Sequence, residues 1–433
     1  MKVLRTDDKK FQARFAEIIN RGSDLSAEVE ENVKDIILQV KEEGDAALLR
    51  LTEKFDGHGA IDVSREAVAD AYTKVDEKLL ASAKTAYRRI ESFHRKQIQN
   101  SWNYTDKGGE VLGQLVRPIE RVGMYVPGGK AVYPSSVLMN AVPARVAGVH
   151  EIIMVTPGKT QHIDPLILIA ADMCGIQKIF KVGGAQAVAA LAYGTETIPK
   201  VDKIVGPGNI YVATAKRFVY GDVDIDMIAG PSEILIISDG TGSPSWAAAD
   251  MLSQAEHDEM ASSILMTTDE QFARSVEYEL SQQLEELSKK QIAKKSLERH
   301  GAIVLSESLE EAVKLANEVA PEHLELYVKN PWDLLDTIKN AGAVFLGHYT
   351  PEAVGDYLAG PNHVLPTGGT ARFYSPLSVD DFIKKTSLIS FSEDALLSVG
   401  DDVVALAQAE GLDAHEKSVA KRLHDIRTNR SKA

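Results

Sequence analysis

The chain has 433 residues, of which 44% are hydrophobic and 26% are charged, and its formal net charge at pH 7 is −15. This length exceeds one ordinary hydrophobic core and predicts two or three domains, while the composition is typical of a globular protein. Because nucleic-acid binding depends on clustered Lys and Arg, the acidic balance argues against a nucleic-acid partner.

Two features concern the cellular location. The first ten residues lack the apolar core of a signal peptide, and no run approaches 18 apolar residues, so we expect no membrane span. The single cysteine, Cys174, stands in an apolar stretch, which favours a buried structural residue over a nucleophile. Without disulfides or a targeting segment, we expect a cytoplasmic protein.

The first hundred residues have the pattern of charged helices. Apolar residues recur at helical spacing from Val29 to Val40 and again from Ala47 to Leu51, and Gly57 is placed to end that helix. More helix is expected over residues 65–100. We interpret this region as a helical scaffold with solvated charges.

Short β-rich runs then alternate with helical runs, in two series. In the first series, strands are expected at 122–126, 152–156, 179–182 and 203–205, with helices at 165–173, 185–193 and 210–220. In the second, strands are expected at 234–237, 264–266, 302–305, 324–328 and 343–346, with helices at 246–260, 270–287, 309–319 and 332–340. Such alternation predicts parallel sheets covered by helices, with ligands beyond the carboxyl ends of the strands.

The C-terminal part has a different character. Residues 366–380 are rich in turn formers and are a candidate linker, and residues 383–433 are expected to be mostly helical. This tail is too small to be stable alone. It must therefore dock on its own body or on a partner chain.

Four segments contain acid, amide and imidazole groups in apolar surroundings. The first includes Gln254 and His257, which are three residues apart and share one face of an expected helix. The others are residues 320–326, 354–363 and 409–415. Each histidine in them by itself fits a packed polar residue equally well, but together the segments supply the ligands that a catalytic zinc uses.

The remaining titratable groups are weaker signals. Glu322 beside His323 suits general acid–base work, although chance adjacency explains it as well. Other histidines, including His58 and His94, lie in polar stretches and are expected at the surface.

A glycine turn, Gly-Pro-Gly-Asn at 206–209, lies between an expected strand and an expected helix. Backbone N–H groups at such a turn can meet a phosphate. The full dinucleotide fingerprint is incomplete, however, and no acidic residue after a following strand is placed for a ribose. The turn alone therefore favours an ordinary tight turn over dinucleotide binding.

Seven runs of residues together resemble the histidinol dehydrogenase family over nearly the whole chain. The runs are Arg-Val-Gly-Met-Tyr-Val-Pro-Gly-Gly (121–129), Val-Gly-Gly-Ala-Gln-Ala (182–187), Val-Gly-Pro-Gly-Asn (205–209), Ala-Gly-Pro-Ser-Glu (229–233), Leu-Ser-Gln-Ala-Glu-His-Asp (252–258), Ala-Pro-Glu-His-Leu-Glu (320–325) and Gly-Pro-Asn-His-Val-Leu-Pro-Thr (360–367). The resemblance implies oxidation of L-histidinol through L-histidinal to L-histidine, the last steps of histidine biosynthesis. It also implies two NAD⁺ and one Zn²⁺ per active site.

The resemblance assigns roles to residues of this chain. It carries His323 onto the general base and Glu322 onto its partner acid. The zinc ligands that it implies are Gln254, His257, Asp356 and His415. The substrate contacts that it implies are these four and His323, joined by Ser232, His363 and Glu410. The NAD⁺ contacts that it implies are Tyr125, Gln186 and Asn209.

The resemblance also bears on the organisation of the chain. It implies a homodimer in which the tail completes the partner's active site, so that Glu410 and His415 act in trans. The fold class we expect is α/β, with two Rossmann-like parallel-sheet units, an N-terminal helical region and a small helical tail. The expected parts are an arm (1–22), a zinc and substrate domain (23–121 with 232–376), an NAD⁺ domain (122–231) and the tail (377–433).

Two alternatives remain at this point. A related zinc- and NAD⁺-dependent dehydrogenase would oxidise another primary alcohol. A zinc hydrolase, in which Glu322 activates a water without any nucleotide, belongs to a different class. The two α/β series and the residues assigned to NAD⁺ argue against the hydrolase.

Overall fold

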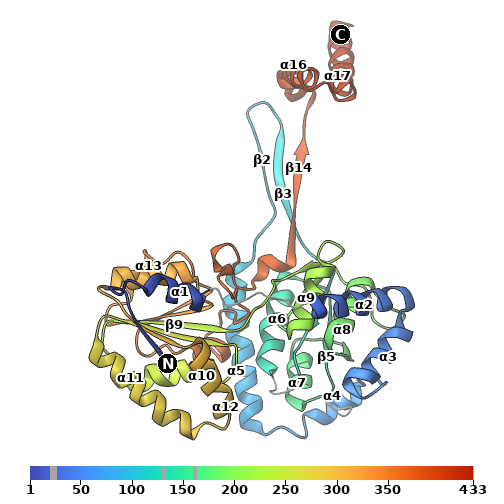
Figure 1. Ribbon diagram of the computed structural model, residues 1–433. Helices are drawn as coiled ribbons and strands as arrows, with labels where there is room; N and C mark the ends of the chain where they lie inside the picture. Colours follow the sequence, from blue (N-terminus) through green and yellow to red (C-terminus); the bar gives the residue numbers. More distant parts are fainter. Residues whose placement is uncertain (20–26, 129–132, 159–162, 433) are drawn as a thin grey trace. The chain divides into compact units, whose positions relative to one another are not determined.

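Three β-sheets organise the chain in this computed structural model (Figure 1). The structure describes residues 1–19, 27–128, 133–158 and 163–432. These residues form two compact units, one of residues 1–97 with 119–382 and another of residues 98–118 with 383–433. The expected end of the arm at residue 22 and the turn residue Gly129 lie outside the described residues.

The first sheet has six parallel strands and lies in the larger unit. In spatial order its strands are β1 (Lys2–Arg5), β11 (Ala302–Leu305), β10 (Ser262–Thr267), β9 (Glu233–Ser238), β12 (His323–Tyr327) and β13 (Ala343–Leu346). The helices associated with it are α1 (Phe11–Ile19), α10 (Pro244–Ala255), α11 (Glu270–Gln283), α12 (Lys290–His300), α13 (Leu309–Val319), α14 (Trp332–Leu335) and α15 (Glu352–Tyr357). Alternate residues of β9 belong to two different hydrophobic cores. Leu235 packs in the core that includes α1 and α13, whereas Ile234 packs in the core that includes α10, α11 and α12. Burial on both faces explains why its strands are continuous apolar runs.

The second sheet has five parallel strands, also in the larger unit. In spatial order its strands are β6 (Lys178–Lys181), β5 (Glu151–Thr156), β4 (Arg121–Tyr125), β7 (Lys203–Val205) and β8 (Asp224–Ile225). The helices around it are α2 (Ala27–Glu43), α3 (Asp45–Asp56), α4 (Arg65–Ala71), α5 (Glu77–His94), α6 (Pro134–Ala147), α7 (Pro165–Met173), α8 (Gly184–Tyr193) and α9 (Ile210–Val219). The chain proceeds from β4 through β5 to β6 and then returns to β7 on the other side of β4. This reversal makes a doubly wound sheet, in which ligands bind at the carboxyl ends near the switch point.

The N-terminal helices pack on the five-stranded sheet. The apolar stripe of α2 and α3, from Val33 to Leu51, shares a core with β5, β6 and α8. We expected residues 23–121 to belong with 232–376 instead. A helical stripe predicts that one face is buried but not which sheet buries it, because that choice depends on contacts far apart in sequence. The remaining domain boundaries stay predictions.

The smaller unit contains the third sheet and two helices. Its strands are β2 (Trp102–Thr105), β3 (Val111–Pro118) and β14 (Ile383–Ser390), which pair antiparallel, and its helices are α16 (Glu393–Ala409) and α17 (Asp413–Lys432). We expected residues 383–433 to be mostly helical. That holds from residue 393 onward, but residues 383–390 are a strand, because they pair with β3 more than 260 residues earlier in the chain.

The elements expected from periodicity are largely confirmed, and the exceptions have physical causes. Gly57 ends α3 in the left-handed conformation, as expected. The apolar helix α6 was not expected, because it is buried on all sides and so lacks an amphipathic period. Cys174 is buried, which raises the pKa of its thiol to about 12 and fits the structural interpretation. Among the described residues, no helix is long and apolar enough to cross a membrane.

Candidate active site

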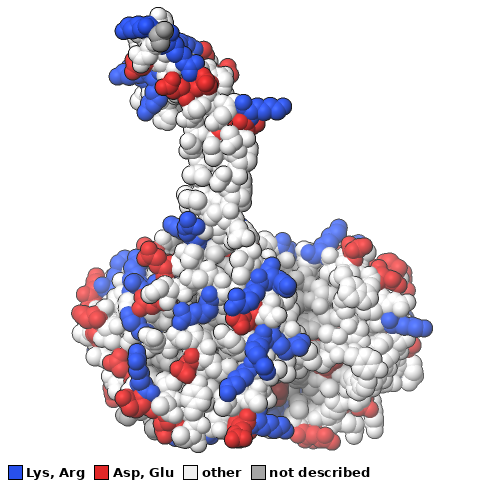
Figure 2. Space-filling model, turned by 180° about the vertical axis from the view of Figure 1, so that it is seen from behind, with Lys and Arg blue, Asp and Glu red and all other residues white. Residues whose placement is uncertain are grey.

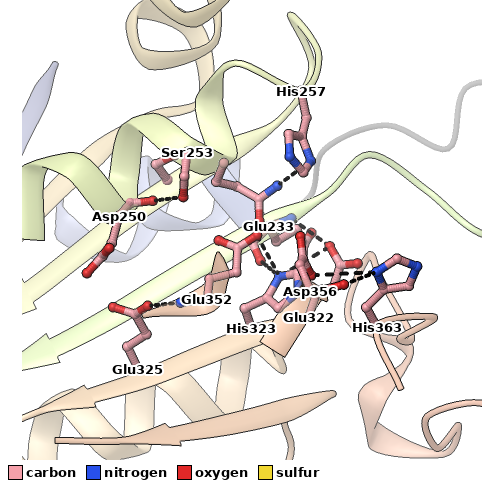
Figure 3. A network of polar contacts seen from close by, with 12 residues as sticks. Glu233, Asp250, Ser253, His257, Glu322, His323, Glu325, Glu352, Asp356 and His363 are labelled. Carbon is pink, nitrogen blue, oxygen red and sulfur yellow. Dashed lines mark hydrogen bonds and ion pairs between the residues drawn. The ribbon is translucent and has the colours of Figure 1, made fainter. Parts of the chain in front are cut away.

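A cluster of buried polar side chains lies at the amino edge of the six-stranded sheet (Figure 3). Glu233 and His323 are the first residues of β9 and β12, and Glu322 directly precedes β12. The last turn of α10 contributes Gln254, and α15 contributes Glu352 and, one helical turn later, Asp356. This is the edge opposite to the carboxyl ends of the strands, where we expected ligands. The polar residues converge here because α10 and α15 end at the edge where β9 and β12 begin.

His323 is held in a single tautomer by the backbone. Its Nδ1 lies 2.9 Å from the carbonyl oxygen of Glu233, which can only accept, so Nδ1 carries the proton. Nε2 is then the unprotonated nitrogen, and it is buried without a hydrogen-bond partner among the described residues. Burial lowers the pKa of His323 to about 4, against the opposing effect of Asp356, whose Oδ1 lies 3.9 Å from Nε2. A neutral imidazole with a free lone pair can accept a proton or bind a metal.

Glu322 is fixed by the same backbone residue. Its Oε2 accepts a hydrogen bond of 2.9 Å from the amide of Glu233 and lies 3.7 Å from Nδ1 of His323. Burial raises the pKa of Glu322 well above its ordinary value, and the charges of Glu233 and Asp356 add to the effect. Ser232, just before β9, also hydrogen-bonds this carboxyl. A carboxyl with a raised pKa is a stronger base than an exposed one.

Gln254 and His257 come together, although not on one helix. We expected a helix over 246–260, but α10 ends at Ala255, so His257 lies in the following turn and is exposed. Gln254 is fully buried. When its amide is turned to satisfy its hydrogen bonds, the nitrogen donates to Oε1 of Glu352 at 3.0 Å, and the oxygen faces Nδ1 of His257 at 3.4 Å. The amide oxygen is therefore directed to the imidazole side of the site.

A metal would find ligands in this cluster. Ligand atoms of His323, Glu352 and Asp356 all lie within 4.8 Å of one another. His363, on the loop after α15, directs Nδ1 toward the backbone oxygen of Asp356 at 3.1 Å, and burial lowers its pKa. Imidazole, carboxylate and amide donors with no cysteine suit Zn²⁺. The donor set of this cluster therefore fits a zinc ion.

The three residues expected to contact NAD⁺ lie at the carboxyl edge of the five-stranded sheet. Tyr125 ends β4, and its hydroxyl accepts a hydrogen bond of 3.2 Å from the amide of Gly184. Burial raises the pKa of Tyr125 to about 12, so its hydroxyl keeps its proton. Gln186, in the first turn of α8, is 1% exposed, and its Nε2 has no hydrogen-bond partner among the described residues. This is the edge at which we expected ligands of a parallel sheet, and the NAD⁺ contacts stay predictions.

The turn between β7 and α9 is held from both sides. Asn209 caps the start of α9, and its Oδ1 accepts hydrogen bonds from the amides of Tyr211 and Val212 at 3.0 and 3.2 Å. The buried side chains of Lys216 and Asp226 form an ion pair and both hydrogen-bond to the backbone of Gly206. Lys216 donates to the Gly206 carbonyl oxygen at 3.0 Å, and Asp226 accepts from the Gly206 amide at 2.8 Å. The position of Asn209 is therefore fixed, and its Nδ2 is directed away from the cap.

Two expected site residues lie in the smaller unit. Glu410 follows α16, and His415 is in the first turn of α17. Both are exposed. Their roles stay predictions.

Sequence reasoning missed several polar residues. Glu352 precedes Asp356 by one helical turn, and this spacing was the available signal. Glu325 is buried, and its Oε1 accepts from the amide of Glu352 at 2.9 Å, so it anchors the start of α15. The expectation that His58 and His94 lie at the surface was wrong, since both are buried. The composition of a polar segment does not show whether a neighbouring element of the fold covers it.

Comparisons with known proteins agree on one family. A sequence model described as histidinol dehydrogenase matches residues 19–423. Histidinol dehydrogenases from Geobacter sulfurreducens and Geobacter metallireducens are each 57% identical over 428 residues, which is 98% of this chain and 100% and 98% of those proteins. The crystal structure of histidinol dehydrogenase from Elizabethkingia anophelis matches with a TM-score of 0.94 at 38% identity, over 99% of each chain.

Proposed function

Because this chain belongs to the histidinol dehydrogenase family, we propose that it oxidises L-histidinol through L-histidinal to L-histidine, using the buried cluster around His323. The observation that carries this assignment is the free, unprotonated Nε2 of His323, enclosed beside Glu322 and Asp356. Two molecules of NAD⁺ would take up the two hydrides.

The first oxidation needs a base for the hydroxyl proton of the substrate. Nε2 of His323 is suited to this, because the low pKa of the buried ring keeps it neutral near pH 7. The hydrogen bond from Nδ1 to the carbonyl of Glu233 fixes the ring orientation and helps to hold the proton that the other nitrogen gains. The base therefore needs no rearrangement before the reaction.

The second oxidation needs water to add to the aldehyde before another hydride can leave. Glu322 lies beside His323, and its raised pKa suits it to remove a proton from that water. The enclosed site would keep the reactive aldehyde bound between the two steps.

Zinc would be held by Gln254, His257 and Asp356, with His415 from the tail. When bound, it would supply a Lewis acid that holds and orients the substrate. Glu352 supports the amide of Gln254 through the hydrogen bond of 3.0 Å, and such outer contacts fix the direction of a ligand. Ser232, His363 and Glu410 would contact the substrate.

Only one end of the Asn209 side-chain amide is available for the proposed contact with NAD⁺. Its Oδ1 is occupied by the α9 cap, so only Nδ2 is free to donate to a cofactor. We expect Asn209→Asp to keep the cap and the unfolding midpoint, yet to raise the KM for NAD⁺ by about tenfold or more, because a donor becomes a negative acceptor beside a polyanion. Steady-state kinetics with varied NAD⁺ measures this. An unchanged KM for NAD⁺ would remove Asn209 from the cofactor site.

Support for a homodimer comes from the smaller unit. Its three-stranded sheet carries few charged side chains along most of the face seen in Figure 2. Trp102 and Ile389 are 52% and 69% exposed. A three-stranded sheet with large exposed apolar side chains needs a covering surface. We propose that a second copy of the chain supplies it and that the tail completes the partner's active site.

A mixture of two inactive variants tests the shared site. Neither His257→Ala nor His415→Ala should turn over alone. After subunit exchange, a heterodimer with the tail acting in trans has one site with both lesions and one with neither. Random pairing then restores about a quarter of wild-type activity, since half of the dimers hold one intact site of two. An inactive mixture with proven exchange would show that His415 serves its own chain.

The function itself is tested by adding NAD⁺ and L-histidinol to the purified protein and following NADH absorbance. Two NADH per histidinol consumed is the expected result. NADH formation only with another primary alcohol would favour the related dehydrogenase. No reaction with any alcohol, together with hydrolysis of an amide or ester, would favour a zinc hydrolase.

A further inference from the structure

The five-stranded sheet lacks a group that doubly wound nucleotide-binding sheets usually have. Its strand order places β5 as the second strand of the first half, beside β4. In such sheets an acidic residue near the end of the second strand accepts a hydrogen bond from the ribose 2′-hydroxyl of NAD⁺. Here β5 ends at Thr156 and continues with Pro157 and Gly158. The only acid of this strand, Glu151, stands at its amino end, so the carboxyl end supplies none.

A distant segment brings an acid and an imidazole to this edge. Asp56, the last residue of α3, accepts a hydrogen bond of 3.1 Å from the amide of Gly183, which joins β6 to α8. His58 lies against Gly158, since a Cβ added to that glycine would be 3.1 Å from its Nε2. Residues of the N-terminal helical region therefore stand where the second strand ends.

This place holds more hydrogen-bonding capacity than it uses. His58 is 2% exposed, and neither ring nitrogen has a hydrogen-bond partner among the described residues. Nε2 of the buried Gln186 is also without a partner there. Buried polar atoms without partners are costly and uncommon in native proteins. Unpaired groups after two neighbouring strands, β5 and β6, at the carboxyl edge of the sheet point to a polar ligand.

We propose that Asp56 accepts the hydroxyl groups of the adenosine ribose of NAD⁺, with His58 beside it, and that its charge excludes the 2′-phosphate of NADP⁺. The proposal rests on the proposed use of NAD⁺. A carboxylate pairs with a ribose diol but repels a phosphate in the same position. The Asp56 carboxyl is partly withdrawn from solvent, so its charge is less screened than at the surface. This burial raises the pKa of Asp56, against the opposing effects of the Gly183 amide and of His58.

The substitution Asp56→Asn isolates the charge, because the Asn side-chain oxygen can still accept from the Gly183 amide. We expect the ratio of kcat/KM for NAD⁺ to that for NADP⁺ to fall at least tenfold, through both a loss with NAD⁺ and a gain with NADP⁺. The KM for L-histidinol should not change. Glu53→Gln removes an equal charge from an exposed position of the same helix; the Gly183 amide donates to Asp56 and not to Glu53, so this control should leave the ratio unchanged.

Binding gives a second readout that does not need turnover. ADP-ribose and its 2′-phosphate, titrated calorimetrically, should show the same change of ratio in Asp56→Asn, and Asp56→Ser replaces it if the Asn variant does not fold. An unchanged ratio in a folded variant overturns the proposal. If wild-type protein forms no NADH from L-histidinol, the proposed function fails instead, and the binding ratio still decides the role of Asp56.

Discussion

Replacing His323 with Asn is expected to lower kcat for both oxidations by roughly 10²–10⁴-fold, the usual contribution of a general base. The Asn side-chain nitrogen can still donate to the carbonyl of Glu233, as Nδ1 does now at 2.9 Å. The substitution therefore removes the free lone pair of Nε2 while it keeps the anchoring hydrogen bond. Stopped-flow NADH formation from L-histidinol and from L-histidinal measures the two steps separately.

A matched control comes from the opposite edge of the same sheet. His348 lies beyond β13, with Nε2 3.1 Å from the hydroxyl of Thr241, and it is far along the strands from the buried cluster. His348→Asn should retain nearly full activity. Activity of His323→Asn within a few-fold of wild type would show that another group takes the protons.

Glu322→Gln should separate the two oxidations. The Gln oxygen can still accept from the Glu233 amide, so the strand start stays in place. Because only the aldehyde step needs added water, the rate with L-histidinal should fall more than the rate of alcohol oxidation. Equal losses on both substrates would contradict the assignment of Glu322 to water activation.

Removal of zinc is expected to abolish turnover, and added Zn²⁺ should restore it. Elemental analysis of the active protein should find about one zinc per chain. Full activity in protein that contains no divalent metal would disprove the zinc site.

The zinc content of variants then distinguishes two ligand sets. If Gln254, His257, Asp356 and His415 hold the metal, then His257→Ala and Asp356→Ala should lose it, whereas Glu352→Gln should only weaken binding by about 10–100-fold, as expected for a group that supports a ligand. If His323, Glu352 and Asp356 hold it instead, His257→Ala keeps its zinc and Glu352→Gln loses it. Atomic absorption after dialysis is the measurement, and it does not depend on activity.

Local sequence determined most of the elements of this protein. Strands such as 151–156 and 203–205 are short apolar runs between turn residues, and Gly57 ends a helix because only glycine readily adopts the left-handed conformation there. The runs that carry Gln254, Glu322 and His323 were recognisable because a site constrains neighbouring residues in the chain. These features depend on residues within one or two turns of each other.

The tertiary structure alone decided which of these elements meet. No periodicity indicates that α2 and α3 pack on the five-stranded sheet, that β14 pairs with β3, or that the polar cluster lies at the amino edge of the other sheet. Nor does it indicate that His58 is buried or that the carbonyl of Glu233 fixes the tautomer of His323. Each of these depends on contacts between segments that are tens to hundreds of residues apart. A local pattern states that a face or a charge must be satisfied, but only the folded chain supplies the partner that satisfies it.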